Sequence, residues 1–300
     1  MTVGSLRVLI AGASGLIGTE LSTQLEAHGH TVVRLVRREA SADDEFSWDP
    51  PTRTIDGNAL DGVDAVVNLT GANIGRVPWT PAYKRSLLTS RIDTTQTLAE
   101  AIAVASTPPA VFIAASAVGF YGDRPGEVLD ESAGKGEGYI PDITDAWEKA
   151  ANIASPVTRV VNLRTGLVMA RGAGALKPLA LTTRLGLGAR FASGTQHWPW
   201  VSLHDEAAAI HHLLSSELSG PVNLAGPTLA TAEDVSRSLA RVLHRWHPFV
   251  IPRAAISIGL GEAGQELLLN DQAMMSPRLL ADGFEFQHQT VDDALEAAFS

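Results

Sequence analysis

The chain has 300 residues, of which 45% are hydrophobic and 19% are charged, a composition typical of folded globular proteins. Its 33 acidic and 23 basic residues give a formal net charge of -10, which argues against a broad basic surface and therefore against nucleic acid as a partner. The absence of cysteine excludes disulfides, thiol nucleophiles and thiolate metal sites. Because no apolar run of about eighteen residues and no hydrophobic leader are present, we expect a cytoplasmic protein without a membrane partner.

Short apolar runs alternate with helix-length segments through the first half of the chain. Residues 7–11 enter a glycine-rich turn, and apolar residues then recur at helical spacing over residues 16–28. Further strands are predicted at residues 31–36, 65–69, 111–115 and 160–163, and further helices at residues 90–105 and 143–154. Strands that alternate with helices predict an α/β fold with a doubly wound parallel sheet of Rossmann type.

After about Thr165 the pattern loosens because glycines interrupt it. Helical periodicity returns at residues 205–215 and 232–243, and residues 291–299 predict a closing helix. We therefore expect a Rossmann domain over residues 1–165 and a smaller C-terminal lobe over residues 166–300, with the chain free to cross back between them. In open α/β sheets ligands bind beyond the carboxyl ends of the strands, so such a lobe would close a substrate cleft.

The turn between the first strand and the first helix reads G-A-S-G-L-I-G. Glycine here lets a pyrophosphate reach the backbone N–H groups at the positive end of a helix. A tight turn alone would also use glycine, but a second strand ends about twenty residues later, as a dinucleotide site requires. The candidate cofactor contacts in this turn are Gly12, Ser14, Gly15, Leu16, Ile17 and Gly18.

The end of the second strand distinguishes NAD from NADP. An NAD site usually ends this strand with Asp or Glu, which binds the ribose 2'-hydroxyl, but here Arg37 and Arg38 precede the first carboxylate, Glu39. Guanidinium groups bind phosphate oxygens bidentately, so the pair predicts a site for the 2'-phosphate of NADP. The alternative is a pair of solvated surface arginines. At the end of the next strand, Leu69, Thr70 and Gly71 either let the backbone lie along the cofactor or form a plain turn.

Several further blocks of sequence carry a resemblance to a known family. They include residues 48–50, 68–73, 90–95, 116–123, 163–166, 200–205 and 220–227, together with residues 277–280 and 283–286 near the C-terminus. In these blocks the chain resembles the extended short-chain dehydrogenase/reductase superfamily, and within it an atypical branch of nucleotide-sugar epimerase type with its own small C-terminal region.

The resemblance implies bound NADP and a small polar or nucleotide-sugar-like substrate. It also implies that Arg91, on the helix predicted at residues 90–105, contacts the cofactor. The residues by themselves indicate only a helix-surface arginine at that position. An oligomer is compatible with the resemblance.

Short-chain dehydrogenases use a Ser or Thr that polarises the substrate oxygen, and a Tyr-x-x-x-Lys pair in which the lysine lowers the tyrosine pKa. Ser116, at the end of a predicted strand, fits the first role, although a serine that only caps a strand end would look the same. Ile143 and Trp147 stand where the Tyr and Lys would lie, so the usual pair is missing. Tyr121, close to Ser116, is a candidate acid/base, and the alternative is a packed loop aromatic.

Histidines offer another replacement for the tyrosine, because their pKa lies near neutrality. His197 and His204 belong to the second lobe and are the candidates, whereas the alternative is that Asp205 is the N-cap of a helix over residues 206–214. His211 and His212 are adjacent on that helix and point apart, so we predict no metal site.

Two functions remain open at this stage. The first is an NADP-dependent enzyme of epimerase or reductase type, with the nicotinamide beside Ser116 and a small-molecule substrate under the C-terminal lobe. The second is a non-catalytic NADP(H)-binding sensor or regulatory protein, suggested by the missing Tyr-x-x-x-Lys pair.

Overall fold

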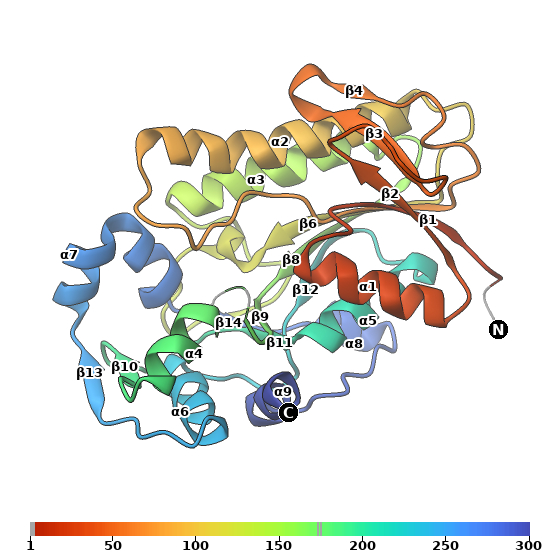
Figure 1. Ribbon diagram of the computed structural model, residues 1–300. Coiled ribbons are helices and arrows are strands. Elements are labelled where there is room, and N and C mark those ends of the chain that lie inside the picture. Colours follow the sequence, from red (N-terminus) through yellow and green to blue (C-terminus); the bar gives the residue numbers. More distant parts are fainter. Residues whose placement is uncertain (1–3, 173, 175) are drawn as a thin grey trace.

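The structure is a computed structural model that describes residues 4–172, 174 and 176–300 (Figure 1). Its centre is an eight-stranded sheet in the order β12-β8-β6-β5-β1-β2-β3-β4. The strands are β1 (Arg7–Ala11), β2 (Thr31–Val36), β3 (Glu45–Asp49), β4 (Thr54–Ile55), β5 (Ala65–Asn68), β6 (Val111–Ala117), β8 (Arg159–Thr165) and β12 (Gly220–Leu224). Their order reverses direction between β1 and β5, which is the switch point where open α/β sheets bind ligands.

Helices cover both faces of this sheet. On one face α1 (Leu16–Ala27) packs beside α5 (Leu203–Ser215), and on the other lie α2 (Pro81–Ala103) and α3 (Tyr139–Ala151) (Figure 1). The strand β1 shows why both faces are buried, since Val8 and Ile10 belong to the first core and Leu9 to the second. A strand buried on both sides needs a continuous apolar run, which is what its sequence provides.

A smaller lobe follows with its own apolar core, which includes Trp198 and Trp200. Its helices are α4 (Leu176–Arg184), α6 (Ala232–Val242), α7 (Arg253–Gly264), the π-helical turn η4 (Gln265–Leu269) and α9 (Val291–Phe299). The short helix α8 (Pro277–Ala281) instead packs on β12 of the main sheet, where Leu279 joins the first core. The strands of the lobe form short pairs, β10 (Ala189–Phe191) with β13 (Phe249–Ile251) and β11 (Trp200–Ser202) with β9 (Leu167–Met169). A third pair joins β14 (Ala273–Met274) to β7 (Val128–Leu129). The chain returns to the main sheet at α5 and β12, so the C-terminal half contributes to both parts.

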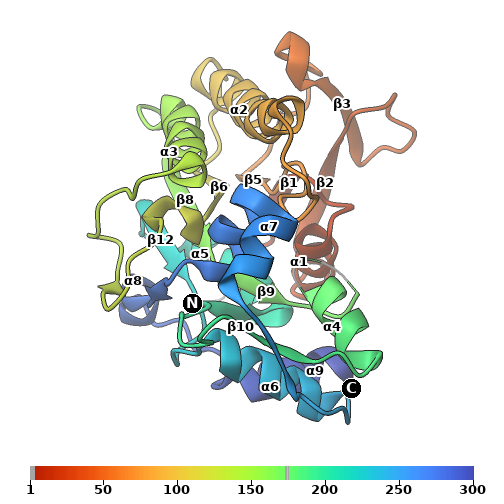
Figure 2. The same cartoon turned by 90° about the vertical axis from the view of Figure 1, so that its left-hand side faces the viewer.

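The helix α7 links the lobe to the helices that begin at the carboxyl ends of the strands. Its Glu262 forms an ion pair with Lys84 in the first turn of α2, with a distance of 2.7 Å between Nζ and Oε2. Figure 2 shows α7 in front of the sheet from this side. The helix α7 therefore lies over the carboxyl ends of the sheet strands, the edge that contains the switch point between β1 and β5.

The α/β fold, the predicted strands and the closing helix are confirmed, but three helix starts were predicted wrongly. The helix expected over residues 143–154 spans Tyr139–Ala151. The helix expected from residue 90 begins at Pro81, because Thr80 accepts a hydrogen bond from the Tyr83 N–H and proline suits the first helical position. Asp205 is not an N-cap: Ser202 caps α5 by accepting from the Asp205 N–H. Within the described ranges, no helix is both long and apolar enough to cross a bilayer.

Candidate functional site

The glycine-rich turn lies between β1 and α1 at the switch point. Gly12 has a φ of 90°, a conformation that favours glycine, and a Cβ on Gly18 would lie 2.2 Å from the Gly12 carbonyl oxygen. Gly15 is the N-cap of α1 and brings no side chain to the N–H groups of the first turn. The backbone N–H groups of the first turn of α1 therefore have no side-chain acceptor, and the turn around them is closely packed. Such N–H groups at a helix N-terminus form a cradle that fits a pyrophosphate.

The two arginines after β2 have different environments. Arg38 is bound to Glu45, with Nη2 to Oε1 at 2.5 Å and Nη1 to Oε2 at 2.8 Å, and hydrogen bonding from Arg38 lowers the pKa of Glu45 to about 2. Arg37 is exposed and forms no ion pair or side-chain hydrogen bond with any residue that the structure describes. Arg37 is therefore the guanidinium that is free to bind a phosphate, whereas Arg38 is already engaged.

The residues after β5 lie against the glycine turn. The Leu69 N–H donates to the Ala11 carbonyl at 2.9 Å, and a Cβ on Gly12 would come within 3.4 Å of the Leu69 and Thr70 backbone. Gly71 in turn lies against the Arg91 guanidinium, which a Cβ there would meet at 3.4 Å. The structure thus brings the predicted turn residues and Arg91 to one edge of the sheet.

Arg91 is held by backbone carbonyls and an aromatic ring. Its Nη1 donates to the Leu87 carbonyl at 3.0 Å, its Nη2 donates to the Ala72 carbonyl at 3.2 Å, and the guanidinium lies 5.1 Å from the centre of the Trp147 ring. Burial lowers the Arg91 pKa. No carboxylate of the described chain pairs with it, so its charge is available to an anion at this edge.

Ser116 belongs to a buried polar network that the sequence did not reveal. Its hydroxyl donates to Glu148 Oε1 at 2.6 Å, and Arg164 binds the same carboxylate through Nε at 2.7 Å and Nη2 at 2.9 Å. Arg164 also donates to the Tyr121 hydroxyl, which donates to Asn223 Oδ1 at 2.7 Å. The sequence carried no clear signal for this network, because α3 and β8 both contain other charged residues, such as Asp145 and Arg159.

This network determines what Ser116 and Tyr121 can do. The single Ser116 proton is directed at Glu148, so the hydroxyl offers lone pairs rather than a hydrogen to a substrate in this arrangement. Tyr121 has 0% exposed surface and both of its hydrogen-bonding functions are used, and burial raises its pKa. Acid/base catalysis by Tyr121 stays a prediction, but these contacts favour a structural role for its side chain.

The helix α3 carries buried side chains at the two positions where the sequence analysis places the usual Tyr-x-x-x-Lys pair. Ile143 is buried, and Trp147 is buried with its Nε1 donating to Thr95 Oγ1 at 2.7 Å. Lys149 is 74% exposed and pairs with Asp145 on the helix surface. None of these side chains supplies the cation that would lower a tyrosine pKa.

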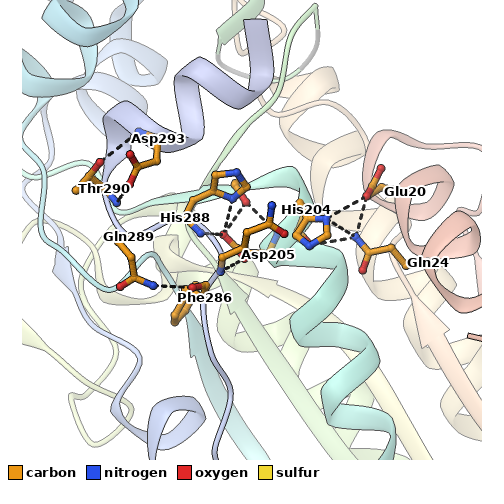
Figure 3. A network of polar contacts seen from close by, with 11 residues as sticks. Glu20, Gln24, His204, Asp205, Phe286, His288, Gln289, Thr290 and Asp293 are labelled. Atoms are coloured by element: carbon orange, nitrogen blue, oxygen red, sulfur yellow. Dashed lines mark hydrogen bonds and ion pairs between the residues drawn. The ribbon is translucent and has the colours of Figure 1, made fainter. Parts of the chain in front are cut away.

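His204 and Asp205 point away from each other and join three parts of the fold (Figure 3). His204 lies beside α1, where the Gln24 amide donates to its backbone carbonyl at 3.2 Å. The buried Asp205 carboxylate accepts from His288 Nδ1 and from the Gln287 and His288 N–H groups. These contacts anchor the C-terminal segment to α5, and they favour a structural role for both residues over an acid/base role.

The remaining histidines also make structural contacts. His197 Nδ1 lies 2.8 Å from Asp271 Oδ1. His211 approaches His30 with 2.9 Å between their Nε2 atoms, whereas His212 binds Asp282 on the other side of α5, so the two adjacent histidines do point apart. In the part of the chain that the structure describes, no group of three or more His, Asp or Glu is arranged to hold a metal ion.

Glu206 is a buried acid that the sequence analysis did not single out. It is fully buried on α5, Thr165 Oγ1 donates to its Oε1 at 2.8 Å, and its Oε2 has no partner among the described residues. Burial raises the Glu206 pKa to about 8, so the carboxyl is neutral at pH 7.

We expect Glu206 to make stability fall as the pH rises. A carboxyl whose folded pKa exceeds its ordinary 4.5 contributes its full stability below pH 4.5 and loses it as the pH rises toward 8, at up to about 1.4 kcal/mol per pH unit. Glu206→Gln removes the titrating carboxyl but keeps the shape of the side chain. The unfolding free energy of this variant should therefore change less between pH 5 and 8 than that of the wild type. Urea unfolding at several pH values measures this, and identical pH profiles for both proteins would contradict the assignment.

A glycine cradle at the switch point of a doubly wound sheet defines a dinucleotide-binding protein of the Rossmann class. The chain matches the NAD dependent epimerase/dehydratase family over residues 8–225 and a domain of unknown function, DUF1731, over residues 251–298. The chain therefore belongs to the NAD dependent epimerase/dehydratase family.

Two relatives match this chain along almost their whole length. An epimerase family protein of Mycobacterium tuberculosis, MT2273, is 41% identical over 290 residues, which are 96% of each chain. Human epimerase family protein SDR39U1 is 32% identical over 295 residues, 97% of this chain and 99% of the relative. A crystal structure of the human protein with NADPH superimposes with a TM-score of 0.90, at 32% identity over 98% of this chain and 99% of that one.

Proposed function

We propose that this protein is an NADP-dependent enzyme of epimerase or reductase type that acts on a small polar substrate. The observation that carries the proposal is the glycine cradle at the N-terminus of α1 beside the unpaired Arg37. The cradle suits the pyrophosphate, and Arg37 suits the 2'-phosphate that distinguishes NADP from NAD. The similar human protein crystallised with NADPH supports the same cofactor.

In this proposal Gly12, Ser14, Gly15, Leu16 and Ile17 surround the pyrophosphate. The segment with Leu69, Thr70 and Gly71 lies along the cofactor, and Arg91 supplies a further cation. The nicotinamide, which would accept or donate the hydride, lies toward Ser116. Ser116 orients a substrate hydroxyl by accepting its hydrogen bond, because its own proton is directed at Glu148.

Arg37→Ala should weaken NADPH much more than NADH. Loss of a charge-assisted contact of about 1.5–3 kcal/mol corresponds to roughly a ten- to hundred-fold rise in the NADPH Kd. Arg38→Ala is the matched control and should have a smaller effect, because Glu45 already binds Arg38. Calorimetric titration of both cofactors measures the difference, and equal weakening of NADPH and NADH by Arg37→Ala would refute the phosphate assignment.

The second candidate function is a non-catalytic NADP(H) sensor, favoured by the buried Ile143 and Trp147 where the dyad would stand. Incubation with stereospecifically deuterated NADPH and a panel of carbonyl compounds separates the two. Transfer of deuterium to a product supports the enzyme. Tight NADPH binding without transfer to any member of a broad panel supports the sensor.

A further inference from the structure

A cavity of about 510 Å³ lies between the strand-end loop after β6 and the C-terminal lobe. Asp123 comes from that loop, which continues from Ser116, while Gln196, Arg253 and Asp271 come from the lobe. Arg253 is the first residue of α7, the helix that lies in front of the sheet in Figure 2. The cavity has the size and the inter-domain position of a small-molecule site.

One side of the cavity presents hydrogen-bond acceptors. The Asp271 N–H donates to Asp123 Oδ1 at 2.7 Å, and Asp271 Oδ1 accepts from both the N–H and Nδ1 of His197 at 2.8 Å. Each carboxylate keeps a second oxygen, Oδ2, with no hydrogen-bond partner among the described residues. No lysine or arginine of the described ranges lies within ion-pair distance of either aspartate, so a ligand with hydroxyl or ammonium donors would be attracted here.

Gln196 adds a buried acceptor to the same side. Its side chain is only 6% exposed, and its Nε2 donates to the Leu268 carbonyl at 2.9 Å and the Phe191 carbonyl at 3.3 Å. With the amide nitrogen oriented in this way, the carbonyl oxygen Oε1 of this cavity-lining residue is left without a described partner. An amide oxygen held in one orientation favours a ligand that places a hydrogen-bond donor next to it.

Arg253 adds a positive charge to the lining of the cavity. Arg253 forms no ion pair with a carboxylate of the described chain, and its Nη1 donates only to the neutral Gln265 Oε1, at 3.3 Å. Pro252, the N-cap of α7, provides no side-chain cap for the first turn. The Ala255 and Ile256 N–H groups donate to the Pro252 carbonyl, so the Arg253 guanidinium is the group that would bind a single anionic group of a ligand.

We propose that this cavity binds the polar end of a small substrate that carries one anionic group together with hydroxyl or ammonium donors, such as an amino or hydroxy sugar acid. The proposal rests on the proposed function, since it names the substrate class of that enzyme. A nucleoside diphosphate fits poorly, because its two phosphates would face two aspartates and a single arginine.

The test uses the full-length protein loaded with NADPH and four probes that differ in charge. Glucosaminate carries both charges, gluconate only the anion, glucosamine only the cation, and UDP-glucose the diphosphate. Saturation-transfer NMR ranks their affinities in wild type, Asp271→Asn and Arg253→Gln, with the exposed Asp43→Asn as a control carboxylate outside the cavity.

We expect glucosaminate to bind best in wild type. Asp271→Asn should weaken glucosaminate and glucosamine about ten-fold but gluconate little, whereas Arg253→Gln should weaken the two acids by a similar factor. The proposal is overturned if UDP-glucose binds more tightly than the three small probes, if none of the three binds, or if neither variant changes the ranking. NADPH binding is measured first by calorimetry, so loss of the cofactor site would be recognised separately.

Discussion

Arg164→Met should lower the free energy of unfolding by about 3–5 kcal/mol, the cost of leaving a buried charge without its partner. The Arg164 and Glu148 side chains are only 4% and 10% exposed, and two charge-assisted hydrogen bonds join them. Removing the guanidinium leaves the Glu148 carboxylate with the Ser116 hydroxyl as its remaining described side-chain donor, and it removes a donor to Tyr121. Chemical denaturation monitored by tryptophan fluorescence measures the loss.

Two further variants show whether the loss comes from the stranded charge. Replacing both partners with methionine should recover much of the stability, because no unpaired charge is then buried. Arg237→Met breaks the ion pair between Arg237 and Glu233, in which Arg237 is 67% exposed, and should cost less than about 1 kcal/mol. If the double variant were less stable than Arg164→Met, the stranded charge would not be the cause.

Gly18→Ala should abolish or strongly weaken cofactor binding while most of the fold is retained. The added Cβ would lie 2.2 Å from the Gly12 carbonyl oxygen and 2.8 Å from Ala13 Cα. Both atoms belong to the backbone, so no flexible side chain can relieve the clash by rotating away. Relieving the clash shifts the turn whose N–H groups form the phosphate cradle. Strain of about 1–3 kcal/mol corresponds to a rise of up to roughly a hundred-fold in the NADPH Kd.

Gly57→Ala is the matched control, since a Cβ at Gly57 meets nothing within 4 Å. Calorimetry with NADPH and a thermal melt on each variant separate a local effect on binding from general unfolding. Unchanged NADPH affinity in Gly18→Ala would contradict the placement of the pyrophosphate at this turn.

Elements with strong local signals were predictable from the sequence. The strands at residues 31–36 and 65–69 and the glycine turn follow from apolar runs and from glycine, which depend on neighbours close along the chain. The starts of α2, α3 and α5 were misplaced. Thr80 and Ser202 cap α2 and α5, whose first turns lack a clear apolar period, and Gly138 at the start of α3 brings no capping side chain. The boundary between the two parts at residue 165 stays a prediction, since α5 and β12 return to the main sheet.

At the candidate site, too, the sequence predicted the residue types and the fold decided which of them are paired. Arg37 and Arg38 looked equivalent in the sequence, and only the fold brings Glu45 onto Arg38 and leaves Arg37 unpaired. The chemistry of histidine and tyrosine made His197, His204 and Tyr121 candidates for catalysis. Their hydrogen-bond partners come from segments distant in sequence, so the sequence could not show that these side chains make structural contacts.

The sequence by itself determined the parallel α/β architecture, the glycine cradle and the absence of a Tyr-x-x-x-Lys pair, because each is a property of residue types at short spacing. Only the tertiary structure decided which charges are paired, with Glu148 bound to Arg164 and Glu206 buried as a neutral acid. The physical reason is that pairing and burial depend on which distant elements pack together, and a pattern along one segment does not contain that information.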